Sequence, residues 1–264
     1  MHSPGSTGLD ELLAAVRRTA AVAGLNLVAA VAAERYDAAV ARDAQRASSI
    51  SERARSIIVL GNGGRDFWTA FRRHADAHPG WLEREHPLDD FTRAVVEGDV
   101  LATLRTADVD PVVTYPFATP GPRLDFVTLG RSAGLVGPSI LGVAVHPTFG
   151  PWVAFRAALL VDRAIELDGD ALGFDPCPAC RAKSCIVACP TGAVHDLEGW
   201  EVPACARHRV EEPESCASRC HARAGCVLGP EHRYSDEELA YHQRRALPAM
   251  QAYHATLASP PRSG

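Results

Sequence analysis

The sequence predicts an α+β protein in two parts, a layer of sheet and helices followed by a smaller cysteine-rich segment. Three observations support this. Short apolar runs typical of strands alternate along the chain with amphipathic runs typical of helices. Near the middle of the chain, two apolar segments flank a turn rich in proline and glycine, which predicts a hairpin within a mixed sheet. All eight cysteines lie between Cys177 and Cys226.

The first half of the chain contains four helix predictions and two strand predictions. Thr7 and Asp10 form a capping box ahead of an apolar helical stripe that ends near Gly24. The following segments read, in order, as a strand from Leu25, a helix from Glu34 to about Arg46, a strand over Arg55–Leu60, a helix carrying Phe67, Trp68 and Phe71, and a helix from about Asp89 to Leu104. Between two of these, Gly61–Gly64 lacks both the dinucleotide glycine spacing and the P-loop lysine, so we interpret it as a strand-to-helix turn.

In the second half, the elements become shorter and the turns more frequent. The expected segments are a strand over Pro111–Tyr115, a helix over Arg123–Ala133 closed by Gly134, strands over Ile140–Val145 and Trp152–Val161, and a last helix from Asp236 to about Ala252. The two strands are joined by the turn His146–Pro151. We place domain boundaries at residues 1–170, 171–232 and 233–264.

Composition narrows the classes of function. Hydrophobic residues make up 47% of the chain, which is enough for a core upstream of the cysteines. No apolar run approaches the roughly 20 residues of a membrane span, and the first residues do not read as a secretory signal. We therefore expect a soluble, cytoplasmic protein. The net charge is −5, and nearly all the positive charge is arginine, because Lys183 is the only lysine. This looks like a compositional bias, so arginine is weak evidence for nucleic acid here and no strong basic footprint is apparent.

The cysteines carry the clearest chemistry. Cys177-Pro-Ala-Cys180, Cys185 and Cys189-Pro190 are close to the bacterial ferredoxin run, in which three cysteines hold one [4Fe–4S] cluster and the fourth holds another. Four more cysteines follow, at Cys205, Cys216, Cys220 and Cys226. Eight thiolates are what two such clusters require, so the sequence predicts two [4Fe–4S] clusters and electron transfer.

Three other interpretations remain open: one cluster with spare thiols, disulfides and structural zinc. Disulfides are typical of exported proteins, and no export signal is apparent. Structural zinc sites usually combine two Cys-x2-Cys knuckles, whereas only Cys177 and Cys180 have that spacing here. By ferredoxin logic, Cys177, Cys180 and Cys185 share one cluster with Cys226. The second cluster then takes the other four cysteines, Cys189, Cys205, Cys216 and Cys220.

Two further residues are candidates for a binding site. His146 ends an apolar segment and precedes a proline, where a structural role and a role at a site mouth are both open. Arg156 stands inside the apolar run Trp152–Leu160, where a charge is costly unless it is paired. Either an anionic ligand or a salt bridge to a neighbouring helix would account for it.

These motifs resemble the cobalamin-dependent epoxyqueuosine reductases and the related CblC-type cobalamin-processing proteins. Ala133-Gly-Leu-Val-Gly137, Gly150-Pro-Trp152 and the cysteine grouping resemble the reductases. His146-Pro-Thr-Phe-Gly-Pro-Trp152, Phe155-Arg156 and Arg233-Tyr-Ser-Asp-Glu237 are similar to the CblC type.

The resemblance implies a nitroreductase-like domain that binds a corrinoid, followed by a ferredoxin-like module that delivers electrons to cobalt. It also implies that Arg156 lies in the cofactor pocket and His146 near its rim. Where the reductases carry a catalytic acid, this chain reads Ala118-Thr-Pro-Gly-Pro122. Asp125 is close by but is expected within the next helix.

The leading hypothesis is an iron–sulfur oxidoreductase that reduces or dealkylates a corrinoid with electrons from a cytoplasmic donor. The catalytic residues are not predicted. An electron carrier that docks a partner enzyme and an enzyme similar to the tRNA epoxyqueuosine reductases are the alternatives, and flavin is the alternative cofactor.

Overall fold

The structure is a computed structural model that describes residues 6–117, 123–165 and 173–258. The segment Ala118–Pro122, where the reductases carry their acid, therefore lies outside the described residues. The chain packs as two compact units. The sheet unit contains the residues up to Gly137 together with Val153–Gly173, and the cysteine unit contains Pro138–Trp152 together with the chain from Phe174 onward. The predicted domain boundaries stay a prediction, but the packing places Pro138–Trp152 with the cysteines.

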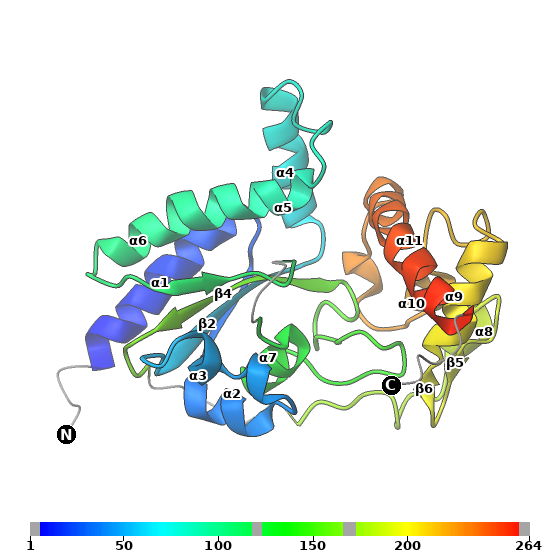
Figure 1. The fold of residues 1–264 in the computed structure, drawn as a ribbon, viewed down its shortest axis with the longest axis horizontal. Helices are drawn as coiled ribbons and strands as arrows, with labels where there is room; N and C mark the ends of the chain where they lie inside the picture. Colours follow the sequence, from blue (N-terminus) through cyan, green and yellow to red (C-terminus); the bar gives the residue numbers. More distant parts are fainter. Residues whose placement is uncertain (1–5, 118–122, 166–172, 259–264) are drawn as a thin grey trace. The chain divides into compact units, whose positions relative to one another are not determined.

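The sheet unit is an α+β structure, as predicted (Figure 1). Its strands are β1 (Leu27–Ala32), β2 (Ser56–Gly63), β3 (Val112–Thr114) and β4 (Val153–Val161), in the order β1-β2-β4-β3. Its helices are α1 (Ser6–Val22), α2 (Ala33–Ala39), η1 (Asp43–Gln45), α3 (Ala47–Ile50), α4 (Asp66–Ala77), α5 (Pro87–Arg93), the π-helical η2 (Ala94–Val100), α6 (Leu101–Arg105) and α7 (Phe126–Ser132).

The pairing of the sheet corrects one expectation. All three strand pairs of this four-stranded sheet are antiparallel, whereas we expected a mixed sheet. The reason is visible at β1 and β2: α2, η1 and α3 bring the chain back to the end of β1 where it left, so β2 runs in the opposite direction.

Both faces of the sheet are covered. Every residue of β2 is buried, as expected for a central strand between two layers. Ile57 and Val59 pack with Tyr36 and Leu129 against α2, α3 and α7. Figure 1 shows α5 and α6 on the other side of the sheet from these helices. Because successive side chains of β2 point to opposite faces of the sheet, this one strand contributes to the apolar core on each side.

One predicted helix is broken. The segment Glu34 to Arg46 leaves α-helical structure after Ala39, because side chains of α2 bind the turn that follows. The Tyr36 hydroxyl donates to the Gln45 carbonyl at 2.9 Å, and Asp37 accepts from the Ala47 amide at 2.6 Å. These bonds compete with the helix for the same backbone groups.

The start of α7 also differs from the expectation. Asp125 is its N-cap rather than an interior residue: Oδ1 accepts from the amides of Val127 at 3.0 Å and Thr128 at 3.2 Å. The Asp125 carboxylate therefore satisfies helix amides, which is a structural role.

The predicted hairpin is wrong in its first strand. The second predicted strand, Trp152–Val161, forms β4 from Val153 onward, but Ile140–Val145 is irregular and belongs to the cysteine unit. The reason lies at Gly142, whose φ is +71° and where a Cβ atom would lie 2.4 Å from Trp200. This backbone conformation ends extended structure and lets Leu141 and Val143 pack among the cysteines.

The cysteine unit contains short elements and one long helix. They are α8 (Ser184–Ala188), β5 (Val194–His195), β6 (Gly199–Trp200), α9 (Val202–Glu211), α10 (His221–Ala224), η3 (Pro230–His232) and α11 (Asp236–Ala258). Helix α11 continues beyond the predicted end near Ala252. No helix in the described part of the chain is both long and apolar enough to cross a membrane.

Candidate redox site

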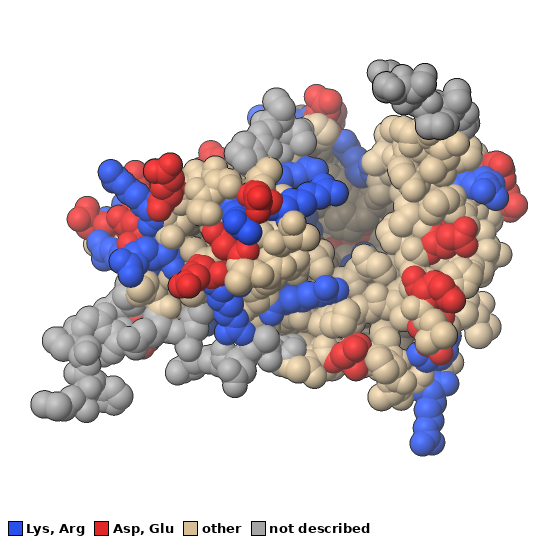
Figure 2. Space-filling model, turned by 60° about the horizontal axis from the view of Figure 1, so that its bottom comes forward, with Lys and Arg blue, Asp and Glu red and all other residues tan. Residues whose placement is uncertain are grey.

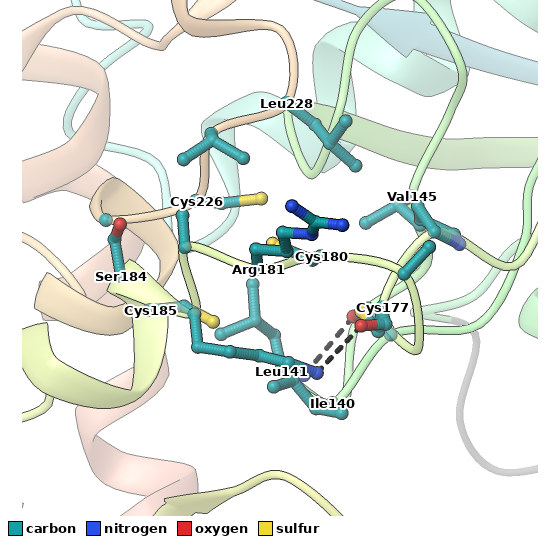
Figure 3. Close-up of a pocket in the computed structure, with 17 residues that line it drawn as sticks. Ile140, Leu141, Val145, Cys177, Cys180, Arg181, Ser184, Cys185, Cys226 and Leu228 are labelled. Carbon is teal, nitrogen blue, oxygen red and sulfur yellow. Dashed lines mark hydrogen bonds between the residues drawn. The ribbon is translucent and has the colours of Figure 1, made fainter.

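Four cysteines surround a first cavity in the cysteine unit. Cys177, Cys180, Cys185 and Cys226 line a volume of about 400 Å³, which we call the first cysteine cavity. Figure 3 shows these side chains around it, with Ile140, Leu141, Val145 and Leu228 completing the wall. Four thiols from separate parts of the chain therefore face one mostly apolar volume.

The local sequence explains how these cysteines meet. The Cys180 amide donates to the Cys177 carbonyl at 3.1 Å, which closes the Cys-Pro-Ala-Cys turn. Lys183 then adopts a left-handed φ of +44° and starts α8, which carries Cys185. Gly225 allows the last cysteine to approach, because a Cβ atom there would lie 2.8 Å from the Ala188 Cβ.

Lys183, the single lysine, fastens this turn. Its Nζ donates to the Cys177 carbonyl at 2.7 Å and forms an ion pair with Asp196. The hydrogen bond to Asp196 is the main reason why the pKa of Lys183 is raised. Lys183 therefore stays cationic beside the first cavity while Asp196 neutralises its charge.

The other four cysteines surround a second cavity. Its volume is about 300 Å³, and we call it the second cysteine cavity; its cysteines are Cys189, Cys205, Cys216 and Cys220. Leu141, Val143 and Trp200 supply apolar wall, and the polar wall includes Arg209, Arg223 and His242. The structure thus gathers the eight cysteines into the two groups of four expected from the ferredoxin spacing.

Two arginines of the second cavity are held by backbone carbonyls. Arg209 of α9 is 8% exposed and donates to the Gln243 carbonyl of α11 at 2.8 Å. Arg223 donates to the Pro151 carbonyl from Nε at 3.0 Å and from Nη2 at 2.6 Å, and lies over the rings of Trp152 and Tyr234.

Burial controls the acidity of the thiols. It raises the pKa of Cys185 and Cys226 in the first cavity, and neighbouring cysteines raise it further. Burial also raises the pKa of Cys205 and Cys216 in the second cavity, where Arg209 acts in the opposite direction. Without a Lewis acid, thiols in such surroundings stay protonated, whereas a bound metal would deprotonate them.

In each group the cysteine side chains surround a cavity and do not converge on the position of a single metal ion. In the described ranges, no three His, Cys, Asp or Glu side chains come close enough together to hold a single metal ion. All eight cysteines are free of disulfides.

The His146 side chain forms its hydrogen bonds within its own turn. Its Nδ1 accepts from the amides of Thr148 at 3.0 Å and Phe149 at 3.2 Å, and burial lowers the pKa of the ring. The turn packs tightly against Leu228 and Gly229, because a Cβ atom at Gly150 would lie 2.2 Å from the Leu228 carbonyl oxygen. The neutral ring thus stabilises the His146–Gly150 turn.

Arg156 occupies a β-bulge in the sheet unit. The register pairs Leu60 with Ala157 and Gly61 with Phe155, so Arg156 is the extra residue of β4 in this register. A bulge redirects the side chain of the extra residue and is frequent next to active sites. Sequence periodicity could not reveal it, because an inserted residue looks like any other member of an apolar run.

The bulge places the Arg156 side chain in a buried site beside Asn62 and Phe67. Arg156 is 8% exposed; its Nε donates to Asn62 Oδ1 at 2.7 Å, and its guanidinium lies 4.7 Å from the ring centroid of Phe67. Asn62 is fully buried, and within the described residues its Nδ2 has no hydrogen-bond partner. Burial raises the pKa of Asp89, and Arg156 is the main opposing charge. Asn62 is a further candidate residue that sequence analysis missed, although a polar residue in a buried strand was a usable signal.

Comparison with solved structures finds the fold in two groups of proteins. The B12-trafficking protein CblC from C. elegans has 13% identity over 96% of this chain and 99% of its own, with a TM-score of 0.60. Epoxyqueuosine reductase from Bacillus subtilis has 14% identity over 86% of this chain and 68% of its own, with a TM-score of 0.53.

A third similarity is to a larger enzyme. The reductive dehalogenase NpRdhA has 15% identity and a TM-score of 0.51; the match spans 92% of this chain but only 36% of the dehalogenase chain. No family model matches the sequence, and no curated protein matches it. At these identities the comparisons show the fold, and they confirm the predicted resemblance to epoxyqueuosine reductases and CblC at that level.

Proposed function

We propose that this chain is an iron–sulfur oxidoreductase that acts on a corrinoid. The observation that carries the proposal is the grouping of eight cysteines around two cavities. Each cavity offers four thiol sulfurs and mostly apolar walls, a donor set that fits a [4Fe–4S] cluster. Such clusters, when bound, supply electrons one at a time at potentials set by their surroundings.

In the first cavity, Cys177, Cys180, Cys185 and Cys226 would hold the cluster. Lys183 fixes the turn that presents the first two of these cysteines, and Leu141 and Val145 exclude water from the thiols.

In the second cavity, Cys189, Cys205, Cys216 and Cys220 would be the ligands. Cys189 follows α8 directly, so α8 and its C-cap residue would supply one ligand for each cavity, Cys185 and Cys189. This arrangement ties the two halves of the cysteine unit together.

The corrinoid part of the proposal rests on the sheet unit. CblC is a B12-trafficking protein, and reductive dehalogenase is described as acting through B12-dependent dehalogenation. In this chain the bulge at Arg156 and the unpartnered amide of Asn62 offer a fixed cation and a spare donor. Both groups could hold polar edges of a bound cofactor. The nitroreductase-like description of the sheet unit and the ferredoxin-like description of the cysteine unit belong to this proposal.

A specific observation supports the alternative of a plain electron carrier. Arg156 already donates to Asn62, so its burial needs no external ligand. In a carrier, the sheet unit would serve only to dock a partner enzyme. A tRNA substrate would need a basic surface, whereas acidic and basic side chains are interspersed over the face seen in Figure 2.

The test begins with anaerobic purification and analysis of iron, sulfide and zinc. We expect about eight irons per chain, since two [4Fe–4S] clusters hold eight. Zinc without iron would contradict the proposal. The optical spectrum is then recorded with cob(II)alamin before and after reductant. A shifted spectrum supports corrinoid binding, whereas full iron content without a shift favours the carrier.

Two variants separate the parts of the proposal. Arg156→Lys keeps the charge but loses the planar donor group, and we expect weaker corrinoid binding with unchanged iron content. Asn62→Ala is expected to act in the same direction. Arg163→Lys, at a half-buried arginine of the same unit that donates to the Asp108 carbonyl, is the matched control.

A further inference from the structure

The two cysteine cavities differ in the charges that face them. Arg209 lines the second cavity and is 8% exposed, with the Gln243 carbonyl as its acceptor. Among the residues that the structure describes, no carboxylate forms an ion pair with Arg209 or Arg223. A buried cation is costly unless an anion compensates it, and the thiolates of this cavity are the anions at hand.

The first cavity is faced by weaker cations. The charge of Lys183 is neutralised by Asp196, and Arg181 is exposed, so water and salt screen it. Figure 3 shows the Arg181 side chain between Cys226 and Cys177. Neither residue offers the buried, unneutralised charge that Arg209 brings to the second cavity.

We infer that Arg209, supported by Arg223, gives the second cysteine cavity the higher reduction potential of the two, so that an electron held by the chain settles there first. The physical reason is that reduction adds negative charge, and a nearby buried cation stabilises the reduced form more than the oxidised one. This inference rests on the proposed function, because it needs a redox group in each cavity.

The cations also set the direction of electron transfer between the two cavities. An electron in the first cavity would pass to the second unless a substrate of higher potential accepts it. The second cavity would then act as the store that is filled first and emptied last. The ion pair of Lys183 with Asp196 contributes to this order, because it keeps the potential of the first cavity low.

The test is an anaerobic redox titration of the full chain, loaded with iron and followed by electron paramagnetic resonance at about pH 8. We expect two separate steps. Cys216→Ser should alter only the step at higher potential, and Cys226→Ser only the step at lower potential. Arg209→Gln should move the upper step down and leave the lower step in place, whereas Arg209→Lys should largely preserve it.

Matched controls remove a charge where solvent screens it. Arg244→Gln, at an exposed residue of α11, and Arg181→Gln in the first cavity should move neither step appreciably. Asp196→Asn should raise the lower step, because it leaves Lys183 without its counter-charge. Asp196 is exposed, so this variant remains informative even if Arg209→Gln loses iron.

The outcomes separate the two ideas. A chain that binds no iron would overturn the proposed function and this inference together. Full iron content with coincident steps would overturn the inference alone. So would a downward shift of the lower step in Arg209→Gln, or a shift in Arg181→Gln as large as that in Arg209→Gln.

Discussion

The sheet unit and the cysteine unit are stabilised in different ways. The sheet unit buries both faces of β2, with Ile57, Ile58, Val59 and Leu60 all at 0% exposure. The apolar clusters of the cysteine unit are small, one around Leu141 and Val194 and another around Trp152 and Tyr234. Its interior is instead occupied by two cavities. The comparison teaches that one unit is held by its own side chains and the other needs what its cysteines bind.

Removal of iron should give the largest difference between the units. A chelator under reducing conditions is expected to unfold the cysteine unit, because ligand-dependent segments lose their structure with the metal. Hydrogen exchange should then rise over residues 174–258 and stay low in β1, β2 and β4. Equal loss of protection in both units would show that they do not differ in this way.

A core substitution should have the opposite pattern. Ile58→Ala removes a fully buried side chain from the central strand, and we expect a loss of about 2–5 kcal/mol in the free energy of unfolding of the sheet unit. Urea denaturation followed by circular dichroism measures this. Iron content per folded chain should not change. A parallel loss of iron would mean that the cysteine unit depends on the sheet core.

Tyr36 allows a test that depends on pH. Its hydroxyl donates to the Gln45 carbonyl and accepts from the Asp125 amide, and burial raises its pKa to about 12. The folded chain therefore keeps this proton at pH values where the unfolded chain loses it. Consequently, the contribution of Tyr36 to stability is complete below about pH 10 and declines as the pH rises from about 10 towards 12.

The matched variant is Tyr36→Phe. We expect it to lower the free energy of unfolding at pH 7 by about 1–3 kcal/mol, since it leaves two buried backbone groups without partners. The difference between the variant and the parent chain should shrink in urea titrations above pH 10. A difference that is constant from pH 7 to 11 would contradict the role given to this hydroxyl.

Two glycine substitutions should give the smallest effects and separate the units again. Gly225→Ala places a Cβ atom 2.9 Å from the Ser184 carbonyl oxygen and close to Ala188, so we expect a loss of about 1–3 kcal/mol in the cysteine unit. Gly98 has nothing within 4 Å, and Gly98→Ala in its helix should stabilise the sheet unit by about 0.5–1 kcal/mol. Thermal unfolding and iron content measure both. Iron loss in Gly98→Ala would contradict the assignment.

Much of the sheet unit could be predicted because burial imposes a period on the sequence. Helix α4 and strands β2 and β4 follow from runs of buried apolar residues. The helix predicted from Glu34 failed because long-range side-chain bonds from Tyr36 and Asp37 decide where it ends. Such bonds leave no periodic signal.

The cysteine unit was predictable in a different sense. The ferredoxin-like pattern of the cysteines anticipated which four would lie together, although Cys226 is distant in sequence from Cys185 and Cys189 is close to it. The spacing could not indicate which other residues would line the two cavities. Leu141 and Val143 come from a segment that looks like a strand, and Arg209 comes from a helix that begins after the first four cysteines. The role of the cysteines as cluster ligands stays a prediction.

The placement of Pro138–Trp152 has a consequence for how the chain is made. Synthesis proceeds from the N-terminus, so β4 leaves the ribosome before any cysteine does. The sheet can therefore close while the residues that will line both cavities wait as a loop anchored at each end, between α7 and β4. When the cysteines arrive, part of their enclosure already exists and is tethered to a folded scaffold. Cluster assembly would then start from a partly formed enclosure and would not have to order the whole cysteine unit by itself.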